Sequence, residues 1–169
     1  MPLETYASNL RELLTSPQLT HHNPDIKLLV LTPGPICAHR WGDRDRENGR
    51  NPERTAEHTA LYAAKAKAVA YELKIPCVDL WTGFLLAAGW KPGDPLIGST
   101  KVPRNGKLGE LLPDGLHFSS AGNQLCFHLV FDKIKEAYPE LNPEKMEVKA
   151  PWFDRDRDIL SILRERYAN

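Results

Sequence analysis

An aspartate and a histidine stand three residues apart in a stretch of this chain that is rich in turn-forming residues. The stretch, residues 111–131, reads LLPDGLHFSSAGNQLCFHLVF, and the pair is Asp114 and His117. In a hydrolytic site, a carboxylate that accepts a hydrogen bond from one imidazole nitrogen holds the ring in one tautomer, and the other nitrogen takes a proton from the nucleophile. Pro113 and Gly115 predict the tight loop that lets the carboxylate turn back to the ring. We therefore interpret Asp114 and His117 as a candidate orienter and general base.

A motif this short also arises without catalysis, and in that alternative Asp114 caps the turn while His117 is a partly buried polar residue. The nucleophile is harder to find. Ser119 and Ser120 are too close to His117 along the chain to attack a bound substrate easily, and we expect one of them to cap the following helix. Cys37 is the best substitute because a cysteine beside a histidine can become a thiolate, although an ordinary loop thiol is the alternative.

The elements that must position this pair include several segments with helical periodicity. In residues 3–15, apolar residues recur at spacings near 3.6 with polar residues between them. The segment 51–74 begins with Asn51 and Pro52, which suit the cap and the first position of a helix. The segment 82–89 has Thr82 as a cap and Gly89 as a stop. The predicted helices cover residues 3–15, 51–74, 82–89, 119–138 and 156–167.

Two aliphatic runs, IKLLVLTP at 26–33 and IPCVDLW at 75–81, predict strands that are buried on both faces. Strands separated by a long helix favour a parallel sheet. Residues 34–51 and 91–113 are polar or rich in proline and glycine, so we predict loops there. A parallel sheet of two strands leaves its edges open, so the chain is more natural as the C-terminal part of a larger doubly wound α/β domain.

Charge and cysteine content exclude several classes of function. The 169 residues hold 22 Lys and Arg and 22 Asp and Glu, and this balance does not support binding to nucleic acid or to an anionic membrane. Cys37, Cys77 and Cys126 form no C-x-x-C and no zinc-ligand spacing, so we predict no metal site and a reduced, cytoplasmic setting. The first residues do not read as a signal peptide, and no apolar run approaches the roughly 18–20 residues of a membrane span.

The stretch LLPDGLHFSSAGNQLCFHLVFDKI resembles the last signature block of the SGNH (GDSL) hydrolases, in which D-G-x-H precedes S-x-x-G and a terminal helix. Three earlier segments also resemble parts of the family. The helix after the family's G-x-N-D block resembles PLETYASNLRELL, and its fourth strand with the Pro-rich loop resembles LLVLTPGPI. The helix, strand and short helix before D-x-x-H resemble RTAEHTALYAAKAKAVAYELKIPCVDLWTGFLLAAGW. The tail YPELNPEKMEVKAPWFDRDRD is similar to the C-terminal wrap of the isoamyl acetate-hydrolysing esterases, one branch of the family. The resemblance covers residues 2–158.

This resemblance implies a flavodoxin-like α/β/α sandwich with a parallel sheet whose N-terminal strands are missing. It implies one partial esterase domain over residues 1–169, with 139–169 as a C-terminal wrap and helix. The implied activity is hydrolysis of a small, short-chain, acetate-like ester without metal or cofactor, with His117 as general base and Asp114 as its orienter. As expected substrate contacts we carry over the Pro-rich loop and the first tryptophan of the short helix: Pro33, Gly34, Pro35 and Trp81.

The family's serine lies in a G-D-S block, and its oxyanion donors include the asparagine of G-x-N-D. Residues 1–30 contain neither block, so we predict that this chain by itself is nearly inert. The alternative is a non-catalytic remnant or interaction module that self-associates through an uncovered sheet edge.

Overall fold

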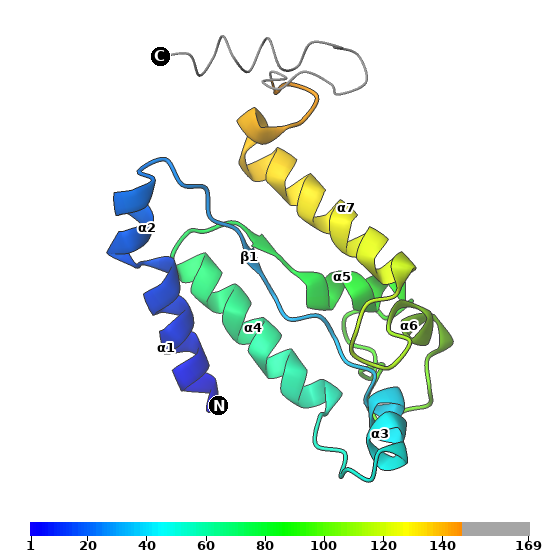
Figure 1. Cartoon of the computed structure of the whole chain (residues 1–169). Coiled ribbons are helices and arrows are strands. Elements are labelled where there is room, and N and C mark those ends of the chain that lie inside the picture. Colours follow the sequence, from blue (N-terminus) through cyan, green and yellow to red (C-terminus); the bar gives the residue numbers. More distant parts are fainter. Residues whose placement is uncertain (147–169) are drawn as a thin grey trace, which may run out of the picture.

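A two-stranded parallel sheet lies at the centre of the described residues, 1–146, of this computed structural model (Figure 1). Strands β1 (Val30–Leu31) and β2 (Cys77–Val78) pair in the register Val30 to Cys77 and Leu31 to Val78. The helices in chain order are α1 (Leu3–Leu14), α2 (Pro17–His22), α3 (Ala38–Glu47), α4 (Ala56–Glu72), α5 (Leu80–Ala87), α6 (Gly106–Leu111), α7 (Ser120–Ala137) and the 3₁₀ turn η1 (Pro139–Leu141).

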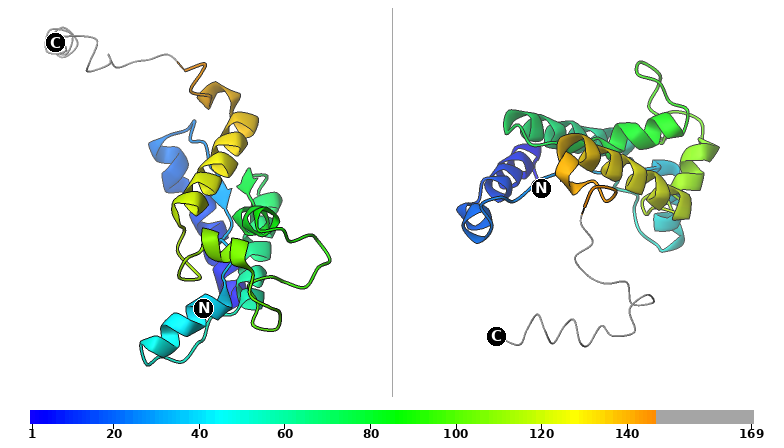
Figure 2. Two further views of the ribbon diagram at one scale, coloured as in Figure 1. Left: turned by 90° about the vertical axis from the view of Figure 1, so that its right-hand side faces the viewer. Right: turned by 90° about the horizontal axis from the view of Figure 1, so that it is seen from above.

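Different helices cover the two faces of the sheet (Figure 2). Side chains alternate between faces along a strand, so neighbouring strand residues join different apolar clusters. Val30 packs with Ala66 and Ala70 of α4, and Tyr6, Leu10 and Leu14 of α1 lie against this cluster. Val78 packs with Leu80, Phe84 and Leu85 of α5, against which Leu125 and Leu129 of α7 lie. The predicted α/β/α sandwich is thereby confirmed.

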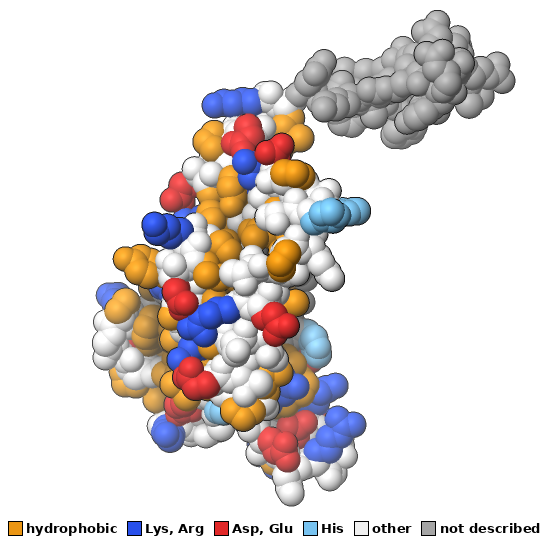
Figure 3. Space-filling model, turned by 90° about the vertical axis from the view of Figure 1, so that its left-hand side faces the viewer, with side chains coloured by type: hydrophobic (Ala, Val, Ile, Leu, Met, Phe, Trp, Pro, Cys, Tyr) orange, Lys and Arg blue, Asp and Glu red, His pale blue; other side chains and the backbone are white. Residues whose placement is uncertain are grey.

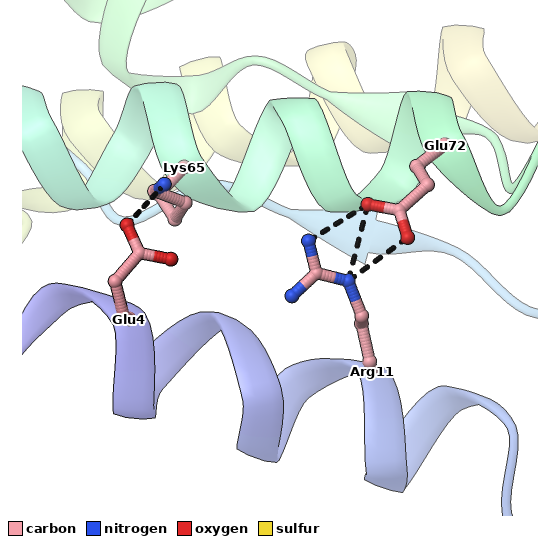
Figure 4. Close-up of polar contacts among 4 residues, drawn as sticks. All are labelled: Glu4, Arg11, Lys65 and Glu72. Atoms are coloured by element: carbon pink, nitrogen blue, oxygen red, sulfur yellow. Dashed lines mark hydrogen bonds and ion pairs between the residues drawn. The ribbon is translucent and has the colours of Figure 1, made fainter.

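Helices α1 and α4 run side by side and are joined at their surface by two ion pairs (Figure 4). Glu4 pairs with Lys65 at 2.7 Å, and Arg11 pairs with Glu72 at 2.8 Å. The Arg11 Nε also donates to Glu72 at 3.0 Å, so this pair is bidentate. Because exposed ion pairs stabilise proteins only slightly, the apolar residues beneath them account for most of the packing between the two helices.

The predicted loops at 34–51 and 91–113 are wrong in part, because each contains a short helix. In α3 the buried residues are Ala38, Trp41, Gly42 and Asp45, which follow helical spacing. Only two of these four side chains are large or apolar enough to read as hydrophobic in the sequence, so the pattern is hidden. Helix α6 is capped by Asn105, whose side chain accepts a hydrogen bond from the Leu108 amide at 2.8 Å.

Helix starts also differ from the predictions. Thr55, rather than Asn51, caps α4, since its hydroxyl accepts from the His58 amide at 3.1 Å. Asp79, rather than Thr82, caps α5. Thr55 and Asp79 each stand directly before the first helical residue, where the side chain can reach the free amides. Asn51 lies too early in the chain, and Thr82 already lies inside the first turn of α5, where its amide and hydroxyl donate to Asp79. The predicted stop at the end of α5 is confirmed, with Gly89 at φ +91°.

The predicted strands are longer than the observed ones, which have two residues each. Val30 is 5% exposed, but Leu31 is 42% exposed, so the prediction that the first strand is buried on both faces is wrong for Leu31. Among residues 1–146, no strand pairs with the second edge of β1. The predicted C-terminal wrap begins with η1, while the predicted helix at 156–167 lies outside the described residues.

The surface carries charges of both signs. Figure 3 shows Lys and Arg side chains interleaved with Asp and Glu over one face of the molecule, with hydrophobic side chains between them. Within residues 1–146, every helix is too short or too polar to cross a bilayer.

Candidate active site

The D-x-x-H segment forms a tight turn between α6 and α7. Gly115 has φ +93°, a left-handed conformation that favours glycine, and its amide donates to the Leu112 carbonyl at 3.0 Å. Its own carbonyl accepts from the Cys37 amide at 2.8 Å. A Cβ at this position would lie 2.5 Å from the Cys37 oxygen and from the Trp41 nitrogen. The turn therefore sits directly on the first residues of α3.

The two oxygens of the Asp114 carboxylate accept different hydrogen bonds. Oδ1 accepts from the amides of Leu116 at 2.9 Å and His117 at 2.8 Å, and this closes the turn. Oδ2 lies 2.6 Å from Nδ1 of His117. Since a carboxylate can only accept, Nδ1 is the donor, and Nε2 is left with a free lone pair. The imidazole is 69% exposed, so Nε2 is open to an incoming group, whereas the alternative of a partly buried histidine predicts a much lower exposure.

The electrostatics keep Asp114 ionised. Partial burial by itself would raise the pKa of this carboxyl, but hydrogen bonds from the His117 ring and from the amides of Leu116 and His117 outweigh it and lower the pKa to about 2. The carboxylate thus both caps the turn and holds the imidazole, so the two sequence interpretations of Asp114 are compatible.

The Pro-rich loop after β1 lies beside this turn. Gly34 approaches the ring of Phe118 so closely that a Cβ would lie 3.0 Å from it. Phe118 in turn stacks on Phe84 at 4.5 Å between ring centroids. Trp41 stands on another side, with its ring centroid 6.1 Å from that of His117. The structure therefore brings the loop that holds Pro33, Gly34 and Pro35 against Phe118, the residue that follows His117 in the turn.

Trp81 is placed differently from the loop. Its amide donates to the Thr32 hydroxyl at 3.1 Å, which links the start of α5 to the end of β1. Its ring packs edge-on against Trp90 at 5.7 Å and lines an apolar cavity of about 390 Å³ between α4 and α5. Trp81 is thus joined through its backbone to Thr32, the residue before the Pro-rich loop, and it lines a cavity separate from the D-x-x-H turn.

A second cavity, of about 490 Å³, adjoins the turn. Its lining includes Asp114, Pro113 and charged residues of α3 and of the segment before α6: Arg40, Asp43, Arg44, Glu47 and Arg104. The sequence did not predict this wall, because a loop was expected where α3 lies. The apolar members of the buried face of α3, Ala38 and Trp41, are too few to reveal the helix.

Two of the three nucleophiles considered from the sequence, Ser119 and Cys37, are engaged or buried, whereas Ser120, the first residue of α7, is exposed. The Ser119 hydroxyl accepts from the Gly122 amide at 3.1 Å and caps α7, as predicted. Cys37 is 2% exposed, which argues against its role as a substitute nucleophile. Among residues 1–146, Asp114 is the side chain that hydrogen-bonds the His117 ring.

Comparison with known proteins gives one consistent family. Residues 1–130 match the sequence model of the GDSL-like lipase/acylhydrolases. A GDSL esterase/lipase of Arabidopsis thaliana is 30% identical over 156 residues, which cover 89% of this chain and 56% of that protein. The isoamyl acetate-hydrolyzing esterase of Saccharomyces cerevisiae is 26% identical over 167 residues, covering 96% of this chain and 61% of the yeast protein.

Among solved structures, the lipase/acylhydrolase from Enterococcus faecalis has a similar fold, with a TM-score of 0.53 and 22% sequence identity. The match covers 81% of this chain and 53% of that one. The chain thus spans about half the length of the relatives it matches. The family match runs through the D-x-x-H turn and most of α7, and this chain belongs to the GDSL-like lipase/acylhydrolase (SGNH hydrolase) family.

Proposed function

We propose that this chain contributes Asp114 and His117 as the orienter and general base of a carboxylester hydrolase. One observation carries the proposal: Nδ1 of His117 donates to an ionised carboxylate at 2.6 Å, while the ring remains 69% exposed. Nε2 takes the proton of a serine hydroxyl as its oxygen attacks the ester carbonyl, and the carboxylate stabilises the imidazolium that forms. The same proton then passes to the leaving alcohol.

For the substrate we propose a short-chain, acetate-like ester. The name of the yeast relative supports an acetate ester, and the Pro33-Gly34-Pro35 loop supports a substrate contact because it follows the carboxyl end of β1. Open α/β sheets bind ligands at that end of their strands. We assign Trp81 a weaker contact, since its ring lines the separate apolar cavity.

Residues 1–169 contain neither a G-D-S nor a G-x-N-D block, and we propose that they hydrolyse such esters poorly by themselves as one partial domain. Loss of one oxyanion donor alone typically costs about 100- to 1000-fold in rate. Loss of the serine removes the covalent route as well. We also propose a cytoplasmic setting, supported by three free thiols at Cys37, Cys77 and Cys126.

The test joins this chain to the part of the Arabidopsis GDSL esterase/lipase that this chain does not cover, where we expect the G-D-S block, and follows hydrolysis of p-nitrophenyl acetate. We expect residues 1–169 alone to be no faster than their His117→Ala variant. The joined protein should turn over, and His117→Ala should lower its kcat by at least about 100-fold, the usual effect of a general base.

The matched control is His128→Ala, because His128 is an exposed histidine of α7 that lies against Phe127 rather than in the turn. Turnover by residues 1–169 alone that depends on His117 would contradict the proposed need for a separate serine. A joined enzyme that keeps full kcat with His117→Ala would refute the proposed base.

A second candidate function is an interaction module, favoured by an edge of β1 that no strand within residues 1–146 covers and by the exposure of Leu31. In this case two copies of the chain would associate through that edge, because unpaired strand edges template pairing. Size-exclusion chromatography with light scattering tests it. A dimer that Leu31→Lys returns to a monomer supports the module, and a monomer at all concentrations rules it out.

A further inference from the structure

The first turn of α3 grips the D-x-x-H turn from both sides. The Cys37 amide donates to the carbonyl of Gly115 at 2.8 Å, on one side of the catalytic carboxylate in the sequence. On the other side, Nη1 of Arg40 donates to the carbonyl of Pro113 at 2.9 Å. The Pro113 carbonyl belongs to the peptide group that leads into Asp114, and the Gly115 carbonyl belongs to the second peptide group after it, so α3 holds the backbone on both sides of Asp114.

Arg40 is an exposed residue whose guanidinium packs against Gly109 of α6. A Cβ added at Gly109 would come within 2.6 Å of Nε and Nη2 of Arg40. A Cβ added at Gly115 would lie 3.1 Å from the Cβ of Arg40. The side chain of Arg40 therefore occupies space that is open because Gly109 of α6 and Gly115 of the turn have no side chain.

Within the described residues, the Arg40 guanidinium is not in an ion pair with a carboxylate. Among residues 1–146, Arg11, Arg46 and Arg104 each have a carboxylate partner, whereas the hydrogen bond of Arg40 goes to a backbone oxygen. A charged donor makes a stronger hydrogen bond than a neutral one, and the carbonyl belongs to a proline whose φ is fixed. The bond therefore restrains the peptide group that leads into Asp114.

We propose that Arg40 is a positioning residue for the Asp114–His117 pair. By holding the Pro113 carbonyl, it keeps Oδ2 of Asp114 at hydrogen-bond distance from Nδ1 of His117, while the amides of Leu116 and His117 hold Oδ1. The proposal rests on the proposed function only in that the pair is the catalytic one. Arg40 acts through the backbone and touches no reacting atom.

The readout is the tautomer of His117, measured from imidazole ¹⁵N chemical shifts of the full 169-residue chain at about pH 9, where imidazoles are neutral. In the native chain we expect the Nδ1–H form to dominate. In Arg40→Met, which keeps the apolar stem, the ratio of Nδ1–H to Nε2–H should fall about threefold, the effect of losing part of one hydrogen bond. Arg40→Lys retains a charged donor and should keep at least half of the native ratio.

Arg46→Met is the matched control, because Arg46 lies on the same helix and pairs with Asp43. Thermal melts of the two methionine variants separate a loss of fold from a loss of positioning. An unchanged tautomer ratio in Arg40→Met, or equal ratios in Arg40→Lys and Arg40→Met, would overturn the positioning role. Dominance of Nε2–H in the native chain would instead contradict the proposed function, so the two failures are distinguishable.

Discussion

Two helix contacts of this molecule are built in opposite ways. Helices α1 and α4 meet through apolar side chains and are bridged at the surface by Glu4–Lys65 and Arg11–Glu72 (Figure 4). Helix α3 meets the backbone of the D-x-x-H turn: the Cys37 amide donates to the Gly115 carbonyl, and the Arg40 side chain donates to the Pro113 carbonyl. The first contact depends on side-chain character, and the second depends on the absence of a side chain at Gly115.

The difference shows where the geometry of the dyad comes from. A side-chain contact adapts to substitution, because exposed rotamers can shift at small cost. A backbone contact at van der Waals distance cannot adapt, because a Cβ at Gly115 would lie 2.5 Å from main-chain atoms of α3. The turn that aligns Asp114 with His117 is therefore expected to be the less tolerant region.

The largest expected effect is that of Gly115→Ala. The positive φ and the collision with α3 together should lower the free energy of unfolding by about 3 kcal/mol or more, measured by urea denaturation. Gly49→Ala is the matched control: Gly49 also has a positive φ, +68°, but a Cβ there meets nothing within 4 Å. It should cost only about 1–2 kcal/mol, and equal losses in the two variants would refute the close contact.

The next effect is an acid dependence that belongs to the turn. The folded-state pKa of Asp114 is lowered from 3.8 to about 2, so its stabilising contribution is fully present above 3.8 and is lost as the pH falls through 2. The stability difference between the native chain and Asp114→Asn should be constant near neutral pH and shrink across that window. Glu72→Gln on the other contact should show a smaller change, because Glu72 and its partner Arg11 are both exposed. A difference that does not shrink in acid would contradict the strong carboxylate hydrogen bonds.

A smaller effect comes from the helix cap next to the dyad. Ser119→Ala should lower the free energy of unfolding by about 1 kcal/mol, as should Thr55→Ala at the start of α4. In the joined enzyme, Ser119→Ala should leave kcat for p-nitrophenyl acetate within about twofold, since capping rather than nucleophilic attack is its role. A collapse of kcat with intact folding would make Ser119 the nucleophile.

The smallest effect is expected between Arg11 and Glu72. A double-mutant cycle with Arg11→Met and Glu72→Gln should give a coupling energy of about 0.5 kcal/mol that weakens in 1 M salt. A coupling energy of several kcal/mol would contradict the conclusion that side-chain pairs contribute little to the contact between α1 and α4.

The features that could be predicted from the sequence are those that depend on the spacing of apolar and turn-forming residues. Helices α1, α4 and α7 and the parallel order of the strands follow from apolar spacing, and the pairing of Asp114 with His117 follows from a loop with Pro113 and Gly115. It missed α3, because a helix that buries Gly42 and Asp45 has no hydrophobic stripe. It therefore also missed Arg40 and Trp41, the neighbours of the dyad.

Boundaries were missed for a similar reason. Asn51 and Thr55 both suit a cap of α4, as do Asp79 and Thr82 for α5, and only the path of the chain decides that Thr55 and Asp79 reach the free amides. The exposure of Leu31 likewise follows from the edge of β1 that no strand within residues 1–146 covers, which no local pattern encodes.

The most direct test of the account is the tautomer of His117 in the native chain and in Asp114→Ala, read from imidazole ¹⁵N shifts at about pH 9. If Asp114 orients His117, the native ring is mainly Nδ1–H, and the variant shifts toward the Nε2–H form that free imidazole side chains favour. Identical tautomer populations in the two proteins, with the fold intact, would show that the 2.6 Å hydrogen bond does not orient the base.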